Sequence, residues 1–267
     1  MRRSAAVAGS FYPARPELLA REVERAIEGD RPRRPVVGCV VPHAGLQYSG
    51  HVAGAVYSRV ELTPTVVLLG PNHYGRGAPL ALYPKGSWET PLGDVAVDEQ
   101  VAAALLAAFP VLEEDAGAHR VEHSLEVQLP FLRYLAPQLR IVPILLSVGD
   151  YATLEELGRV VAAVVKAQHP RPLVLASSDF NHYESDSVTR VKDRKAIEAI
   201  LALDPRRLYD TIRRERISMC GYEPTIALLT AAHELGVANA ELIRHATSAE
   251  VSGDYNRVVG YAGIVLW

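Results

Sequence analysis

The amino-acid sequence predicts an α/β fold, a three-layer αβα sandwich in which helices cover both faces of a mainly parallel sheet. Apolar runs of strand length recur between stretches of helical periodicity, and this alternation is typical of the class. The predicted strands are continuously apolar, as burial on both faces requires. Glycine and proline are scattered through the chain and form no linker, so residues 1–267 are expected to form one domain.

The elements follow one another in an order that suits this architecture. Strands are predicted at residues 36–41, 65–69, 140–146, 172–176 and 258–266. Helices are predicted at residues 16–28, 50–60, 98–108, 124–135, 153–168, 188–201 and 223–235. In such sheets the groups that bind and react collect in loops beyond the carboxyl ends of the strands. The residues directly after each apolar run are therefore the candidates for function.

The charge of the chain argues against several classes of partner. A net charge of −3 and a pI near 6.3 give no overall positive field, so direct binding to nucleic acid is not expected. The basic cluster Arg31, Arg33 and Arg34 is interpreted as a solvated linker. No apolar run approaches the roughly 20 residues needed to span a bilayer, and the N-terminus lacks a signal-peptide pattern. A cytoplasmic location without membrane association is expected.

The two cysteines differ in their settings. Cys39 and Cys220 are far apart and form no CxxC pair, which argues against a disulfide framework and a structural zinc knuckle. Cys39 lies within an apolar strand and is expected to pack in the core. Cys220 precedes the predicted helix that Pro224 is suited to begin, and a helix N-terminus favours thiolate as nucleophile or metal ligand. Glu223, in the first turn, is interpreted as a helix-dipole cap.

Histidines follow the first two predicted strands. His43 lies in the sequence PHAG at residues 42–45, and His73 lies in GPNH at residues 70–73. The prolines and glycines predict tight turns that hold each imidazole at the edge of the sheet, where a neutral nitrogen can bind a metal or accept a proton. For either residue alone a structural histidine is the alternative. Two equivalent placements favour function.

Two further loops carry polar candidates. The strand at 172–176 leads into SDFNHY at residues 178–183, where Asp179 can orient an imidazole or act as a base and His182 can bind metal or move protons. A helix cap is the alternative for Asp179. In EHSLE at residues 122–126, His123 is expected in the first helical turn, whose positive end lowers the pKa of the imidazole. Glu126 is interpreted as part of a capping box.

Other ring-bearing residues complete the predicted pocket. Tyrosines beside these loops are expected to form a wall that receives a flat or polar ligand; they are Tyr48, Tyr74, Tyr183 and Tyr222. The remaining histidines lie in helical, exposed-looking or terminal contexts and are expected to carry no chemistry; they are His51, His119, His169, His233 and His245.

Taken in order, these motifs resemble the Memo family, also called AmmeMemoRadiSam system protein B. The resemblance begins with AGSFYP at residues 8–13, continues through the motifs above and ends with MCGY at residues 219–222, so it covers nearly the whole chain. It implies a fold similar to the class III extradiol dioxygenases, which are non-haem iron enzymes. It also implies His43, His73 and Cys220 as ligands of Fe(II) or copper, with Asp179, His182 and His123 as catalytic residues lining the same pocket.

The resemblance leaves the reaction open. The dioxygenases use two histidines and a carboxylate, whereas Cys220 stands here in the place of the carboxylate and makes a softer ligand set. A metal-dependent redox protein is the leading hypothesis. The alternatives are a metal-free enzyme with Cys220 as nucleophile, and a module that binds a peptide or a small anion. The family's second name further implies a functional link to a radical SAM protein and to an AMMECR-type protein.

Overall fold

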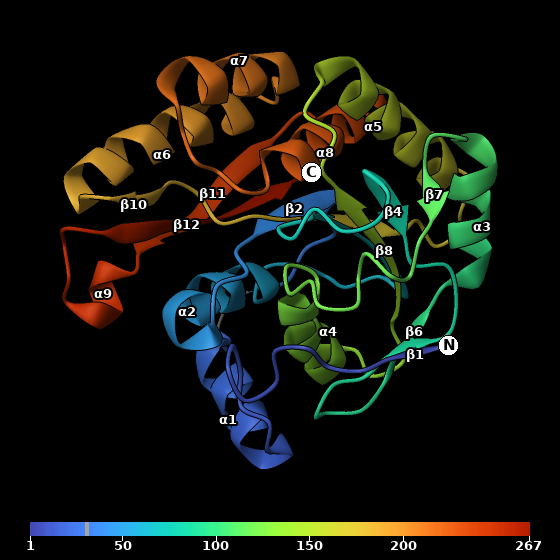
Figure 1. Cartoon of the computed structure of the whole chain (residues 1–267), viewed down its shortest axis with the longest axis horizontal. Coiled ribbons are helices and arrows are strands. Elements are labelled where there is room, and N and C mark those ends of the chain that lie inside the picture. The colour runs from blue at the N-terminus through green and yellow to red at the C-terminus, as the bar shows by residue number, and fades with distance from the viewer. Residues whose placement is uncertain (30–31) are drawn as a thin grey trace.

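The computed structural model describes residues 1–29 and 32–267, arranged around one large sheet (Figure 1). The strands are β1 (Arg2–Arg3), β2 (Gly38–Val41), β3 (Thr65–Pro71), β4 (Leu80–Leu82), β5 (Ser87–Trp88), β6 (Val95–Val97), β7 (Glu113–Glu114), β8 (Arg140–Leu146), β9 (Leu173–Ser177), β10 (His182–Glu184), β11 (Ala240–Thr247) and β12 (Val258–Leu266). The helices are α1 (Pro16–Ala26), α2 (Leu46–Tyr57), α3 (Glu99–Ala108), η1 (Glu126–Gln128), α4 (Leu129–Leu135), α5 (Tyr151–Lys166), α6 (Asp186–Leu201), α7 (Pro205–Glu215), α8 (Tyr222–Glu234) and α9 (Ala249–Ser252).

The centre of the sheet is parallel. Strands β6, β8, β3, β9 and β2 pair in that order, each parallel to the next. The strand β12 continues the sheet antiparallel to β2, and β11 pairs antiparallel to β12. Every residue of β2, β3 and β9 is buried, in agreement with their continuous apolar sequences. The predicted fold class, a mainly parallel sheet between helices, is confirmed.

Helices cover both faces of this sheet (Figure 1). Helix α8 packs on β2, β3 and β9, and α5 lies against α8 on the same side. Helix α2 packs on β2, β11 and β12 from the other side and is in turn covered by α1. None of the helices in the described ranges is long and apolar enough to cross a membrane.

Several predicted boundaries need correction. The strands at 140–146 and 258–266 have the predicted limits. The strand predicted at 36–41 is β2 and begins at Gly38, and α2 begins four residues earlier than predicted. The helix predicted at 124–135 begins with a short 3-10 turn at Glu126, so residues 122–125 are loop. Of the basic cluster, Arg31 lies outside the described residues. Arg34 is no free linker residue, because it pairs with Glu241 at 2.6 Å and covers the ring of Trp267.

Candidate functional site

The register of the parallel strands brings three site loops to one edge of the sheet. Val41 of β2 pairs with Ser177 of β9, and Leu69 of β3 pairs with Ala176, so these strands end at the same level. The loops that carry His43, His73 and Asp179 therefore start side by side. Because this alignment follows from parallel pairing, the sequence argument from strand ends applies directly.

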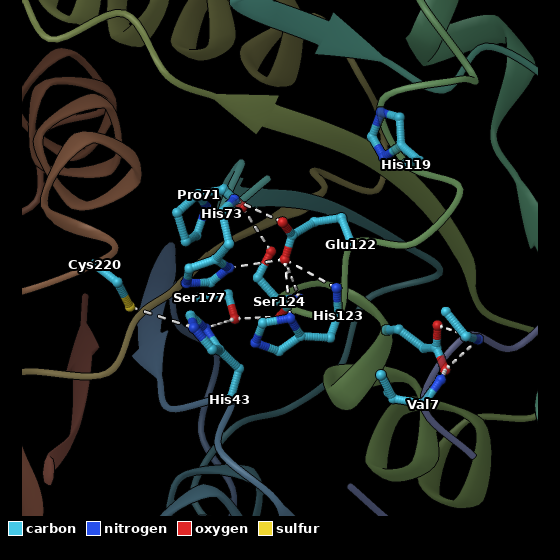
Figure 2. Close-up of polar contacts among 12 residues, drawn as sticks. Val7, His43, Pro71, His73, His119, Glu122, His123, Ser124, Ser177 and Cys220 are labelled. Carbon is cyan, nitrogen blue, oxygen red and sulfur yellow. Dashed lines mark hydrogen bonds and ion pairs between the residues drawn. The ribbon is translucent and has the colours of Figure 1, made fainter. Parts of the chain in front are cut away.

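Three imidazoles meet above this edge. His43, His73 and His123 each offer a ring nitrogen, and these nitrogens all lie within 4.8 Å of one another. The ring centroids are 5.2 Å apart for His43 and His73 and 4.6 Å apart for His73 and His123. Figure 2 shows the three rings turned toward one another. The structure thus brings both predicted strand-end histidines together with His123.

Hydrogen bonds fix the tautomer of His43. Its Nδ1 lies 2.9 Å from Ser177 Oγ, which donates its own proton to the carbonyl of Ser124 at 2.6 Å and accepts from Gln128 at 2.8 Å. Since that hydroxyl proton is already used, Ser177 Oγ accepts from Nδ1–H of His43. The Nε2 atom of His43 therefore carries a free lone pair, the form in which imidazole binds a metal.

Glu122 organises the rest of the cluster (Figure 2). Its carboxylate lies 2.9 Å from Nδ1 of His73 and accepts from the backbone N–H groups of His73, His123 and Ser124. Burial alone would raise the pKa of Glu122, but these hydrogen bonds and the neighbouring imidazoles lower it to about 2. A carboxylate at Nδ1 leaves Nε2 of His73 free for a metal. Sequence reasoning assigned Glu122 no role, although it stands next to His123 in the EHSLE motif.

His123 lies in a different local structure from the one predicted. It precedes the 3-10 turn at Glu126–Gln128 and is not part of a helical turn. The pKa of His123 is lowered to about 4, as predicted in direction, but the main cause is burial rather than a helix end. Its ring lies 4.7 Å from the ring of Phe11, and its Nδ1 has no hydrogen-bond partner in the described part of the chain.

Cys220 approaches the cluster from the loop before α8. Its Sγ lies 3.3 Å from Nε2 of His43 (Figure 2) and accepts from the backbone N–H of Asp179 at 3.3 Å. Cys220 is not among the three residues whose ligand atoms all lie within 4.8 Å. The close approach depends on Gly221, where a Cβ would lie 2.4 Å from the carbonyl oxygen of Ser177. Burial and the nearby Asp179 raise the pKa of the Cys220 thiol well above its usual range.

Asp179 and His182 each make a defined hydrogen bond with the backbone of a neighbouring loop. Asp179 Oδ1 accepts from the backbone N–H groups of His43 at 2.8 Å and Ala44 at 3.3 Å, so it holds a loop rather than an imidazole or a helix end. Burial raises the pKa of Asp179 against these hydrogen bonds. His182 lies on β10, where its Nδ1 donates to the carbonyl of Ser218 at 2.8 Å. Its Nε2 is therefore the nitrogen left for chemistry.

A cavity of about 870 Å³ opens above these side chains. Its polar floor and wall contain all six residues of the predicted site, namely His43, His73, His123, Asp179, His182 and Cys220. Its aromatic walls are Phe11, Tyr48, Tyr74, Tyr183 and Tyr261. Tyr222, predicted to belong to the wall, turns its hydroxyl to Glu223 and does not line the cavity. The volume is within the range of sites for small organic ligands.

Three residues that were interpreted as structural have other surroundings than those predicted. Glu126 forms no capping box; it is fully buried and pairs with Arg3 at 2.6 Å. Glu223 is no simple dipole cap, because it accepts from the backbone of Val148 and Gly149. His119 was expected in an exposed-looking context, whereas it is fully buried with Nε2 3.0 Å from the carbonyl of Ala81.

Acid is expected to destabilise the metal-free protein once the pH falls below about 6.5. Burial lowers the pKa of His119 to about 3 and of His123 to about 4, so both bind protons on unfolding. Their stability contribution is present above the unfolded pKa and is lost as the pH falls toward the folded values, at about 1.4 kcal/mol per pH unit for each group. Urea unfolding at pH 7, 6 and 5 measures this slope.

The controls for this slope are single variants. His123→Gln should reduce the slope by the contribution of one group, about 1.4 kcal/mol per pH unit. His233→Gln, at an exposed position on α8, should leave the slope unchanged. A slope that is the same in wild type and His123→Gln would contradict the assignment of a neutral buried imidazole.

A family model described as Memo-like protein matches residues 3–265 of the chain. The chain belongs to the Memo family. The resemblance drawn from the six sequence motifs is thereby confirmed. The match includes the loops that carry the three imidazoles of the cluster.

Curated relatives of this Memo family chain match it over its full length. A MEMO1 family protein of Methanopyrus kandleri is 44% identical over 279 residues, with 99% of each chain covered. A MEMO1 family protein of Methanosarcina barkeri is 45% identical over 266 residues, again with 99% of each covered. Among solved structures, an uncharacterized protein of Escherichia coli is similar, with a TM-score of 0.59 and 11% identity over 85% of this chain and 98% of that one. This last similarity concerns the fold alone.

Proposed function

We propose that this Memo family protein binds one redox-active transition metal, Fe(II) or copper, through His43, His73 and Cys220, and uses it in redox chemistry on a small molecule. The observation that carries the proposal is the convergence of imidazole nitrogens within 4.8 Å. His123 lies close enough to serve as a further nitrogen ligand. Imidazole with thiolate is a set that suits copper and iron.

Hydrogen bonds orient the imidazoles of His43 and His73 for metal binding. Nδ1 of His43 and of His73 are held by Ser177 and Glu122, so both Nε2 atoms are available. Two ligands of one ion stand about 3–4 Å apart, and Cys220 Sγ lies 3.3 Å from Nε2 of His43. The carboxylate of Glu122, whose pKa is lowered, places buried negative charge beside the imidazole of His73. A bound cation would offset the cost of that charge.

The protein residues define what the site can do around the metal. Iron or copper, when bound, supplies one-electron transfer and an open position for substrate or oxygen. His182 can hold or release a proton at Nε2 within the same cavity. Asp179 fixes the loop of His43 by accepting its N–H, and aromatic side chains line the rest of the cavity. The substrate is therefore expected to be small and to enter from the cavity.

A metal-free thiolate nucleophile is less well supported. Burial and Asp179 raise the pKa of Cys220, whereas a nucleophilic cysteine requires surroundings that lower it. Binding of a metal would supply the positive charge that stabilises the thiolate. The functional link to a radical SAM protein and an AMMECR-type protein stays a prediction, which co-purification of the native protein would test.

Metal content of the purified protein tests the proposal. We expect about one iron or copper per chain in the wild type and less than a tenth of that in a triple His43→Ala, His73→Ala, Cys220→Ala variant, because a site without ligands loses the whole binding energy. His233→Gln, outside the cavity, is the matched control. Cys220→Ser alone should abolish the thiolate-to-metal absorption band of the copper form. Metal retained by the triple variant, or zinc as the native metal, would overturn the redox assignment.

A further inference from the structure

One buried asparagine joins the two loops that carry His182 and Cys220. Asn181 is fully buried and lies directly before β10. Its Oδ1 atom accepts from the backbone N–H of Ser218 at 3.2 Å and from the hydroxyl of Ser218 at 3.1 Å. Ser218 in turn lies two residues before Cys220. A single amide oxygen therefore connects the segment that leads into His182 with the segment that leads into the thiol.

Ser218 holds His182 at two points. The carbonyl of Ser218 accepts from Nδ1–H of His182 at 2.8 Å, and the hydroxyl of Ser218 accepts from the backbone N–H of His182 at 2.8 Å. The proton of that hydroxyl goes to Oδ1 of Asn181 at 3.1 Å, the nearer of its two acceptors. The imidazole of His182 therefore keeps its proton on Nδ1 and its lone pair on Nε2 for as long as Ser218 is held in this position.

The amide of Asn181 has only one orientation that satisfies its neighbours. Its Nδ2 donates to Glu184 at 2.8 Å and to Thr189 at 3.2 Å. A reversed amide would place NH₂ against the two donors of Ser218 and an oxygen against the carboxylate of Glu184. The backbone N–H of Asn181 donates to the buried carboxylate of Asp193 at 2.9 Å. The side chain thus makes all four hydrogen bonds that an amide allows, and its Oδ1 faces Ser218.

The chain directly after His182 is strained. Tyr183 has φ of 64°, a left-handed conformation that is unfavourable for a residue with a Cβ. Because Tyr183 is 66% exposed, the packing of its own side chain does not explain this conformation. Asn181 supports the residues on both sides, since it holds His182 through Ser218 and holds Glu184 through Nδ2. Strain of this kind persists only where surrounding contacts fix it, and it is typical of functional positions.

We propose that Asn181 is a positioning residue for His182: through Ser218 it fixes the tautomer of the imidazole and keeps the lone pair on Nε2, the nitrogen left for the cavity. The use of that lone pair to move protons rests on the proposed function, whereas the tautomer itself does not depend on a metal. Because Ser218 also leads into Cys220, the same amide oxygen sets the place of the thiol loop relative to the His182 loop.

Nitrogen NMR of protein labelled with ¹⁵N-histidine tests this assignment, because it reports which nitrogen of an imidazole carries the proton. The protein is metal-free and kept at a pH of about 8.5, above the usual range of imidazole pKa values. The signal that disappears in His182→Gln belongs to His182. We expect the Nδ1–H form of His182 in about 5-fold excess over the Nε2–H form in the wild type, the ratio that one hydrogen bond supports. Asn181→Leu should lose this excess.

Two further variants separate positioning from a general loss of stability. Asn181→Asp keeps an oxygen for both donors of Ser218 but loses the hydrogen bonds to Glu184 and Thr189, so the tautomer should stay that of the wild type while the melting temperature falls. Thr189→Val is the matched control, because it removes one hydrogen bond of the same amide on the side away from Ser218. It should also leave the tautomer unchanged. Equal loss of the excess in Asn181→Asp and Asn181→Leu would overturn the positioning role.

A milder change covers the case in which Asn181→Leu does not fold. Ser218→Ala removes the hydroxyl that joins Asn181 to the backbone N–H of His182 and should reduce the excess to about 2-fold, since the carbonyl contact remains but is less firmly held. Ser218→Thr retains the hydroxyl and should retain the excess. An excess that is unchanged in Ser218→Ala, or in folded Asn181→Leu, would contradict the proposal.

Failure of this inference and failure of the metal proposal are separate results. The tautomer measurements need no metal, no substrate and no turnover. If the protein takes up no metal but His182 loses its tautomer in Asn181→Leu, the metal proposal fails and the positioning role of Asn181 stands. If iron or copper binds as expected while the tautomer is the same in wild type and Asn181→Leu, the positioning role fails and the metal proposal stands.

Discussion

Glu126→Ala is expected to lower the free energy of unfolding by about 3–5 kcal/mol, the cost of breaking a buried ion pair from one side. Glu126 is fully buried and pairs with Arg3 at 2.6 Å. It also accepts from the backbone of Ala6 and Val7 and from the hydroxyl of Tyr12. Removing it leaves the buried guanidinium of Arg3 without its counter-ion and takes the acceptor from the buried donors of Val7 and Tyr12.

Urea unfolding of matched variants measures this loss. Glu241→Ala removes the partner of Arg34 in a partly exposed pair and should cost less than about 1 kcal/mol. The double variant Arg3→Met, Glu126→Leu should recover only the part of the loss that comes from the unpaired charge, because Ala6, Val7 and Tyr12 still lack their acceptor. A loss below about 1 kcal/mol in Glu126→Ala would show that the pair contributes no more than a surface contact.

Glu122→Gln is expected to weaken metal binding about 10- to 100-fold, the usual effect of losing a carboxylate that supports a histidine ligand. The carboxylate accepts at 2.9 Å from Nδ1 of His73 and also holds the backbone of His123. An amide places an NH₂ group against at least one of these donors and removes the negative charge. The imidazole is then held less firmly and is a weaker ligand.

Competition with a chelator of known affinity gives the metal dissociation constants. Glu223→Gln is the matched control, because Glu223 is a buried carboxylate that accepts from the backbone of Val148 and Gly149 and touches none of the imidazoles. Both variants should lose similar stability, but only Glu122→Gln should lose affinity for the metal. Equal metal affinity in Glu122→Gln and wild type would mean that His73 does not bind the ion.

The ends of the predicted strands indicated several residues that line the cavity. His43, His73 and Asp179 each follow an apolar run, and parallel pairing necessarily brings such positions to one edge. The residues that hold the imidazoles, Glu122 and Ser177, could not be predicted in the same way. Glu122 lies in a loop whose path depends on tertiary contacts, and Ser177 is a small residue at the end of β9. Neither has a periodicity or a spacing that marks it as a support for an imidazole.

Two elements that the sequence did not predict, α7 and β11, are rich in polar residues. The helix α7 carries many charged residues and was not predicted, although Asp204 caps it and Pro205 begins it. The strand β11 is only partly buried and contains Glu241, Arg244 and His245 among its apolar residues. Apolar runs identify the central strands because those are buried on both faces, and they fail at the edges, where one face meets water.

The cavity wall at Phe11 belongs to a segment that is held by a residue far along the chain. Residues 3–12 are synthesised before Glu126, which holds them and lies 123 residues beyond Arg3. During synthesis Val7 and Tyr12 therefore lack the carboxylate that they bind, and contacts of such long sequence separation form slowly. A chain that ends before Glu126 would lack the carboxylate that holds residues 3–12, so this side of the cavity forms only after residue 126 has been made.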